Sequence, residues 1–268
     1  MSYADIVLDA SPRRDIAPLI EAAASLALAF GSRLSVVAAA WPKVSLIREA
    51  FSASTFSASA QVRQCEEALT TTRSIGDRVL AERGLQPTWC CEVAEPTAIL
   101  VDHLLTADLA ITAAGDHEGF AAVDACHLAA RSGAPVLRLG SPSSALSFDR
   151  VVVAWKDGLE ARRAVHEALP ILRRAQHVLV LGVGDEVHSD GLDALTQHLQ
   201  RHRVQAQARH VSDGGQGVSA EILRHAEAEA CGLIVSGAYS RSRLKEMILG
   251  GVTRDLQHTP EIAWFLAH

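Results

Sequence analysis

The order of short apolar segments in the first half of the chain recurs in the second half, and this internal repeat constrains the fold more than any other feature. Five segments match in the same order, at offsets of 145, 144, 119, 124 and 125 residues. The matched pairs are DIVL at 5–8 with RVVVA at 150–154, RLSVVAA at 33–39 with HVLVLGV at 177–183, LQPTW at 85–89 with VQAQA at 204–208, ADLAITAAG at 107–115 with CGLIVSGAY at 231–239, and the proline of GAPVLRLG with that of HTPEIAWF. The chain therefore consists of two copies of one unit with local insertions.

The largest change of offset locates an insertion in the first half. The offset falls by 25 between the second and third matched segments, which places the extra residues after Trp41. That stretch, KVSLIREAFSASTFSASAQVRQ at 43–64, is rich in serine and alanine. We interpret it as a linker inserted into the first copy.

Each copy alternates short apolar strands with segments that carry apolar residues at helical spacing. Parallel strands need a crossover connection, usually a helix, so this alternation predicts parallel pairing. We therefore predict an α/β fold of two doubly wound domains, each with a parallel five-stranded sheet, at residues 1–140 and 150–268. The segment 141–149, which contains Pro and Ser, is the predicted linker between them.

Composition and charge exclude several classes of protein. Of 268 residues, 49% are hydrophobic and 21% are charged, which excludes a disordered chain. The 25 Lys and Arg against 31 Asp and Glu give a net charge of -6 without basic blocks, so we expect no nucleic-acid partner and no membrane partner. There is no secretion signal, no long uninterrupted apolar window and no CxxC pair among the five cysteines. We expect a cytoplasmic protein with reduced thiols.

The second half carries a glycine-rich and basic segment directly after its fourth strand. In an open parallel sheet a ligand binds beyond the carboxyl ends of the strands, where the strand order reverses. Here Gly237 follows the strand, Arg241 begins a basic loop, and Gly250 and Gly251 precede a helix. Glycines let the backbone approach an anion closely, and N–H groups at a helix start attract phosphate. The pattern predicts a phosphate-binding site in the second half.

At these residues the chain resembles the universal stress protein family in its tandem two-domain form, and the resemblance covers nearly the whole chain. The flanking text GLIVSGAYSRSRLKE and LGGVTRDL is similar to that of family members. The family's nucleotide-binding pattern is glycine, two residues, glycine, nine residues, glycine, then serine or threonine. It falls on Gly237, Ser240, Gly250 and Gly251 with its spacing intact. The resemblance implies an adenine nucleotide alpha hydrolase-like fold, a role in stress response, and ATP or AMP as a regulatory ligand of the second half.

The resemblance also implies which residues contact the ligand. The predicted binding set is Ala154, Trp155 and Val183 on the adenine side and Lys156, Gly237, Ser240, Arg241, Gly250, Gly251, Val252 and Thr253 on the phosphate side. Three positions depart from the family pattern. Ser240 replaces a glycine, Gly251 replaces a hydroxyl residue, and Lys156 stands where family members often carry an aspartate near the adenosine. A lysine at that position suits a phosphate better than a ribose.

The first half has lost the same pattern. Ala113 stands at the position of Gly237, and Asp116 stands at that of Ser240. The carboxylates of Asp116 and Glu118 would repel a phosphate, and the repulsion grows in a partly desolvated cleft. We therefore expect no nucleotide in the first half.

The sequence contains no signature of a catalytic site. It lacks a P-loop, a G-x-S-x-G elbow, an H-E-x-x-H motif and a complete G-x-G-x-x-G after the first strand. No set of nucleophile, base and oxyanion stabiliser is recognisable, so we expect no enzyme activity beyond, at most, slow ATP hydrolysis. His198 and His202 stand four residues apart on a predicted helix, but no third ligand has a suitable spacing, so no metal site is predicted.

Two alternatives to a nucleotide-binding stress protein stay open. The changes at Ser240, Gly251 and Lys156 favour a nucleotide-free interaction scaffold in which both sites are degenerate. An adenine-nucleotide-dependent enzyme, such as an ATP pyrophosphatase or an electron-transfer flavoprotein subunit, can share this type of sheet. The glycine/serine loop of the pyrophosphatases is missing after both first strands, which disfavours that hypothesis.

The last strands of the two copies are expected at 135–139 and 261–266. Members of the family commonly dimerise through their last strands, and exposed strand edges need covering. We therefore expect the two halves to pair within one chain as a pseudo-dimer, existing as a monomer or a homodimer. The chain would act through a protein partner that the sequence does not identify.

Overall fold

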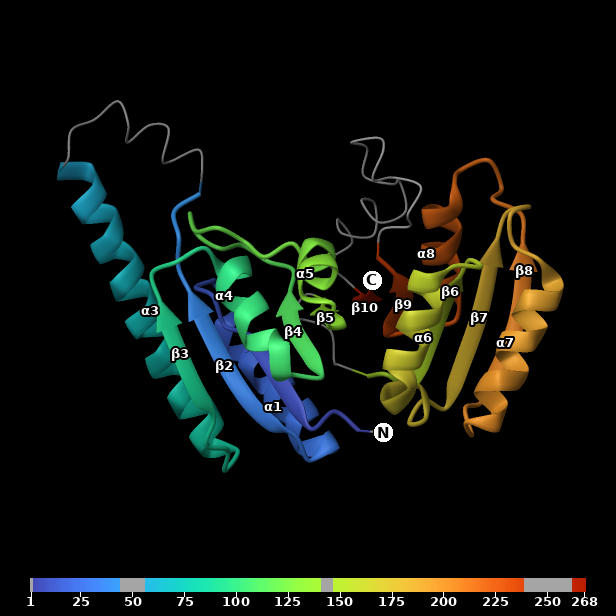
Figure 1. Ribbon diagram of the computed structural model, residues 1–268, viewed down its shortest axis with the longest axis horizontal. Coiled ribbons are helices and arrows are strands. Elements are labelled where there is room, and N and C mark those ends of the chain that lie inside the picture. The colour runs from blue at the N-terminus through green and yellow to red at the C-terminus, as the bar shows by residue number, and fades with distance from the viewer. Residues whose placement is uncertain (1, 44–55, 141–146, 239–261) are drawn as a thin grey trace. The chain divides into compact units, whose positions relative to one another are not determined.

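The computed structural model describes residues 2–43, 56–140, 147–238 and 262–268 (Figure 1). Strands and helices alternate along both halves of the chain. The strands are β1 Asp5–Asp9, β2 Arg33–Ala39, β3 Thr88–Glu92, β4 Leu109–Ala113, β5 Val136–Leu139, β6 Arg150–Trp155, β7 His177–Val183, β8 Ala206–Val211, β9 Leu233–Gly237 and β10 Ala263–Ala267. The helices are α1 Ile16–Phe30, α3 Phe56–Glu82, α4 Pro96–His103, the short η1 Leu104–Thr106, α5 Ala125–Ser132, α6 Leu159–Leu172, α7 Ser189–Arg201 and α8 Val218–Ala228. Most of the predicted linker 141–149 lies outside the described residues.

The first compact unit, Tyr3–Ala134, contains a parallel sheet. Its strands stand in the order β3-β2-β1-β4, and each neighbouring pair is parallel. Helix α3 packs against β2 and β3, and α4 packs against β1 and β2. The side chains of Ile6, Leu8 and Ile111 are fully buried in this sheet. Such apolar strands, covered by helices, are typical of parallel sheets.

The second compact unit contains Pro135–His268, and its strand order is β5-β10-β9-β6-β7-β8. The pairs β10–β9, β9–β6, β6–β7 and β7–β8 are parallel, whereas β5 and β10 pair antiparallel. Helix α6 lies against β9 and β10, and α7 lies against β8. Strand β5 closes the first repeat in the sequence but belongs to the second unit because of its pairing with β10. The predicted pairing of the last strands within one chain is therefore confirmed.

The strand register reproduces the offsets of the sequence repeat. In the first unit Ile6 of β1 is paired with Leu109 of β4, and in the second unit Val151 of β6 is paired with Leu233 of β9. Ile6 and Val151 are 145 residues apart in the chain, and Leu109 and Leu233 are 124 residues apart, as in the sequence repeat. The chain is thus built from two copies of one α/β unit, which confirms the predicted fold class.

The third strand of each half begins two or three residues later than predicted. The N–H of Leu85 donates to the Leu80 carbonyl at 2.9 Å, and the N–H of Val204 donates to the Leu199 carbonyl at 3.0 Å. Both bonds close the last turn of the preceding helix, α3 or α7. The prediction is wrong there because the chain is still leaving a helix where a strand was expected.

The insertion in the first half lengthens a helix. Helix α3 has 27 residues, whereas its counterpart α7 has 13. The predicted linker is therefore wrong from Phe56 onward, since the Ala-containing segment continues as helix and alanine has the highest helix propensity. The rest of that linker, 44–55, lies outside the described residues. Neither α3 nor any other helix in the described part of the chain is long and apolar enough to cross a membrane.

Candidate functional site

The strand order reverses once in each unit, and this reversal is where a ligand of an open parallel sheet binds. From β1 the chain continues to β2 and β3 on one side and then returns to β4 on the other side of β1. The same return places β9 beside β6 in the second unit. We call residues 9–15 and 112–118 the first edge, and residues 154–158, 183–186 and Gly237 the second edge.

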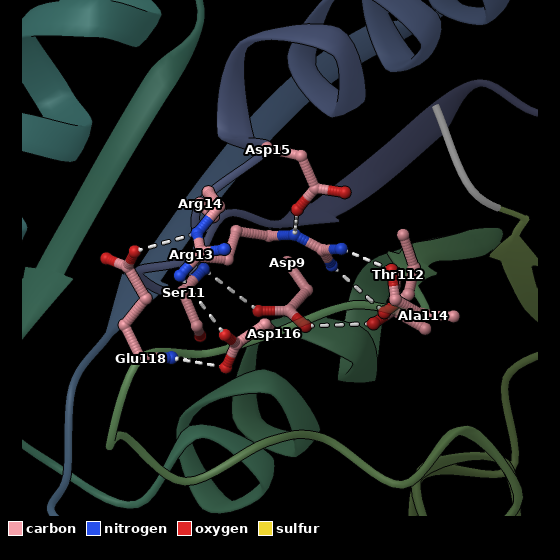
Figure 2. A network of polar contacts seen from close by, with 10 residues as sticks. Asp9, Ser11, Arg13, Arg14, Asp15, Thr112, Ala114, Asp116 and Glu118 are labelled. Atoms are coloured by element: carbon pink, nitrogen blue, oxygen red, sulfur yellow. Dashed lines mark hydrogen bonds and ion pairs between the residues drawn. The ribbon is translucent and has the colours of Figure 1, made fainter. Parts of the chain in front are cut away.

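Asp9, the last residue of β1, joins β1 to β4 at the first edge (Figure 2). The residue is only 2% exposed. One carboxylate oxygen accepts a hydrogen bond from the Ser11 N–H at 3.1 Å, and the other accepts one from the Thr112 hydroxyl at 2.9 Å. A buried carboxylate is costly without such partners. Both oxygens of Asp9 are therefore stabilised by groups of the same unit.

Arg13 fills the space between the two strand ends, with a side chain that is 1% exposed (Figure 2). Its Nε donates to Asp15 Oδ1 at 2.8 Å, one Nη donates to the Ala113 carbonyl at 3.0 Å, and the other Nη donates to the Ala114 carbonyl. The guanidinium also occupies the space that a Cβ on Gly115 would need. Burial raises the pKa of Asp15, but the hydrogen bond and the charge of Arg13 together bring it below its ordinary value.

A second arginine pairs with the acidic residues that follow β4. The Arg14 guanidinium lies 3.3 Å from a Glu118 carboxylate oxygen and 3.6 Å from one of Asp116, and all three side chains are exposed. Asp116 also accepts a hydrogen bond from the Glu118 N–H at 3.0 Å. That bond, followed by the charge of Arg14, lowers the pKa of Asp116. The acidic residues that were expected to repel a phosphate therefore have a counter-ion in the same unit.

His117 is a buried titratable group of the first edge, and it is 4% exposed. Burial lowers its pKa below the usual 6.5; the charge of Asp9 opposes this change, while those of Arg13 and Lys43 reinforce it. Within the described residues, His117 Nδ1 and the Ser11 hydroxyl are buried and have no hydrogen-bond partner. Burial therefore disfavours the charged form of His117.

The sequence comparison missed this network. In the local sequence the network is marked only by DASPRRD at 9–15, where an aspartate at the end of an apolar strand is followed by two arginines. The carbonyl groups that accept from Arg13 lie 100 and 101 residues further along the chain. A contact over that distance is not visible in a local pattern.

The second edge brings four predicted binding residues to the ends of neighbouring strands. Ala154 and Trp155 end β6, Val183 ends β7, and Gly237 ends β9. Strand β6 is paired with both β7 and β9, so these ends lie side by side. Val183 is buried, and Ala154 and Trp155 are half-buried. The structure thus collects the three residues predicted for the adenine side.

Lys156, predicted for the phosphate side, follows β6 and is exposed. Its Nζ forms an ion pair with Glu186, whose side chain is also exposed. The hydrogen bond and the charge of Lys156 lower the pKa of Glu186. The neighbouring Trp155 indole N–H donates to Asp157 Oδ1 at 3.0 Å. The lysine of the second edge therefore has a counter-ion of its own.

Gly237 has a packing role in addition to its predicted one. A Cβ at this position would lie 2.7 Å from the Ala161 N and from the Glu160 carbonyl carbon, which belong to the first turn of α6. Real Cβ atoms do not approach backbone that closely, so a glycine lets α6 begin directly over the end of β9. The helix N-terminus therefore lies at the second edge.

The other predicted phosphate-side residues lie outside the described residues. They are Ser240, Arg241, Gly250, Gly251, Val252 and Thr253. Their contribution to binding stays a prediction.

His198 of α7 and His202, the residue that caps the C-terminus of this helix, lie close together. The rings of His198 and His202 have centroids 4.6 Å apart, and an Arg173 Nη lies 3.0 Å from His202 Nδ1. In the described ranges no three His, Cys, Asp or Glu side chains come together as metal ligands.

Three solved structures match nearly the whole chain. A universal stress protein from Archaeoglobus fulgidus is 13% identical, with a TM-score of 0.69 over 97% of this chain and 95% of that one. A protein from Pseudomonas aeruginosa UCBPP-PA14, assigned provisionally to the universal stress proteins, is 16% identical, with a TM-score of 0.60 over 99% and 93%. A protein of unknown function from Pseudomonas aeruginosa PAO1 is 15% identical, with a TM-score of 0.59 over 99% and 92%. No family model and no curated protein sequence matches the chain.

Proposed function

We propose that this chain, whose fold is that of the full-length universal stress protein structures it matches, is itself a tandem universal stress protein. We further propose that its second half binds ATP or AMP as a regulatory ligand in stress response. The observation that carries the proposal is the second edge, where the ends of β6, β7 and β9 gather Ala154, Trp155 and Val183 at the reversal of strand order. That is where open parallel sheets bind ligands.

The adenine side of the proposed site is apolar and partly preformed. Trp155 offers an aromatic surface beside Ala154 and the buried Val183. Its indole is held by the hydrogen bond to Asp157. A held aromatic ring can stack on a purine at a low entropic cost.

The phosphate side combines a cation with a helix start. The N-cap residue of α6, Gly158, has no side chain to bond the first N–H groups of the helix. Such N–H groups and the helix dipole favour an anion. Lys156 supplies a positive charge two residues earlier, while Glu160 in the first turn of α6 offsets part of it. Gly250 and Gly251 are the further residues predicted from the sequence for this side.

We propose a regulatory role and not a catalytic one. Lys156 is paired with Glu186, and Asp157 accepts from Trp155, so neither is poised to activate a water. A general base must reach the proton it removes. The nucleotide would then act by changing how the chain binds a protein partner, with at most slow hydrolysis.

Isothermal titration calorimetry of the purified chain with ATP and with AMP tests this proposal. We expect wild type to bind one nucleotide per chain, and Gly250→Asp to weaken binding at least about tenfold by placing a carboxylate against the phosphates. Gln197→Asp is the matched control, because Gln197 is an exposed residue of α7 away from the strand ends. Mass spectrometry of small molecules released from the native protein should show an adenine nucleotide. No heat with wild type, or equal affinity in Gly250→Asp, would overturn the proposal.

A nucleotide-free scaffold is the second candidate, and one observation favours it. Lys156 already has Glu186 as its counter-ion, so an incoming phosphate must displace a carboxylate. The absence of any bound or titratable nucleotide would select this scaffold.

A further inference from the structure

The first edge has the chemistry of a guanidinium receptor. The groups around Arg13 are all acceptors: the Asp15 carboxylate and the Ala113 and Ala114 carbonyls. We propose that Arg13 is a built-in ligand, which occupies this receptor and closes the first half to external ligands. The proposal is independent of nucleotide binding in the second half.

The shape of the receptor fits a planar fork and not a point charge. Arg13 reaches acceptors from two loops, with Nε directed to Asp15 and the two Nη groups to successive carbonyls at the end of β4. Guanidinium presents five N–H donors in one plane, whereas an ammonium has three donors on one atom. A lysine at position 13 could not serve the same three acceptors.

The backbone of the β4 loop leaves room for the guanidinium. A Cβ on Gly115 would collide with Arg13 Nη2. The cation is also taken out of water, since its side chain is 1% exposed. A charge buried to this extent is stable only with full pairing, so the receptor and its occupant depend on each other.

The sign of the charges makes the first edge a cation site. The Asp15 carboxylate is paired with Arg13, while both oxygens of the neighbouring Asp9 carboxylate are already engaged by Ser11 and Thr112. A phosphate in the place of the guanidinium would meet the Asp15 carboxylate and two carbonyl oxygens. At the offset of 145, Gly158 stands where Arg13 stands, so the second edge lacks this occupant. Among the residues that the structure describes, closure by an internal arginine is therefore found in the first half only.

Chemical rescue of a truncated side chain tests the proposal on the full chain without nucleotide. We expect Arg13→Ala to lower the thermal midpoint by roughly 10 °C, because it leaves buried acceptors unpaired. Guanidinium chloride at about 20 mM, far below denaturing concentrations, should then raise the midpoint of Arg13→Ala by several degrees through binding to the folded state. Sodium chloride at equal ionic strength should have no such effect, and wild type should show no increase with guanidinium. Equal responses of Arg13→Ala to the two salts would overturn the proposal.

A second set of variants keeps the test decisive if Arg13→Ala does not fold. Gly115→Ala should lower the thermal midpoint of wild type for two reasons: the added Cβ displaces the guanidinium, and the φ of +156° at Gly115 strains a residue with a Cβ. Arg13→Lys should lower it too. In the Arg13→Lys background Gly115→Ala should cost less than in wild type, because the displaced planar group is gone and only the backbone strain at Gly115 remains. Strictly additive shifts, or an Arg13→Lys variant as stable as wild type, would show that Arg13 is not held as a ligand.

Discussion

The first and second edges occupy the same place in the same topology, but their polar groups are satisfied in different ways. At the first edge Asp9 and Arg13 are buried and bond to the end of β4. At the second edge the offset of 145 places Ala154 and Gly158 at those positions, and neither side chain can form such bonds. Strand order thus determines where a site can form, and a few side chains determine whether the chain fills that site itself.

A hydroxyl at one shared register position shows the same difference. Thr112 of β4 and Ser236 of β9 are separated by the offset of 124. Thr112 donates across the reversal to Asp9, whereas Ser236 accepts from the Trp264 indole N–H of β10 at 2.8 Å. In the first unit this hydroxyl ties the two strands of the edge together. In the second unit the equivalent hydroxyl bonds to the neighbouring strand β10 instead.

The largest expected effect is on the stability of the first edge. Asp9→Ala leaves the Ser11 N–H and the Thr112 hydroxyl without their buried acceptor, and we expect it to lower the free energy of unfolding by about 3 kcal/mol. Ser236→Ala removes one acceptor, that of Trp264, and should cost only about 1 kcal/mol. Urea denaturation followed by circular dichroism measures both. Equal losses of unfolding free energy in the two variants would show that the two edges do not differ in this way.

A smaller effect is expected from pH at the same edge. Burial lowers the pKa of His117, so the folded state binds its proton less readily than the unfolded state, where the pKa is near 6.5. The contribution of His117 to stability is therefore fully present at neutral pH. It is lost as the pH falls through 6.5 towards the lower pKa of the folded state, and below that pKa nothing more is lost. Urea unfolding at a series of pH values should therefore show a smaller acid loss in His117→Gln than in wild type. The control is His127→Gln, because His127 is exposed. The prediction is wrong if His117→Gln loses as much stability between neutral and acidic pH as wild type does.

The smallest effect is expected at the second edge, where the ion pair is exposed. Lys156→Ala should weaken ATP binding by about threefold, and Glu186→Gln should strengthen it by a similar factor, because exposed pairs contribute little and are screened by salt. Calorimetry at low and at high salt measures both variants, and the difference between them should shrink at high salt. Changes in the same direction would show that Lys156 and Glu186 do not compete with the phosphates.

Much of the fold could be predicted from the sequence. The predicted strands 33–39 and 177–183 coincide with β2 and β7, because each is a mostly apolar segment that directly follows residues with apolar positions at helical spacing. The third strands were predicted too early, since the last turn of a helix and the first residues of a strand share the same apolar pattern. The inserted helical turns of α3 were missed because a Ser- and Ala-rich segment suits both a linker and a helix.

The candidate site could be predicted only in part. Ala154, Trp155 and Val183 follow from the family resemblance together with the rule that strand ends meet at one edge. Gly237 was predicted for the approach of a phosphate, and the structure shows that α6 also requires a glycine there. A sequence pattern cannot separate these two reasons, because both need a residue without a Cβ.

The sequence by itself determined the two copies and their α/β class, because periodicity and repeat offsets are properties of the chain order. The pairing of the last strands was expected from the family resemblance. Only the tertiary structure decided how each edge is neutralised. Arg13 meets its carbonyl partners across 100 residues, and Lys156 meets Glu186 across 30. Such contacts depend on which loops the strand order brings together and on the space left between them, and neither is written in the spacing of residues along the chain.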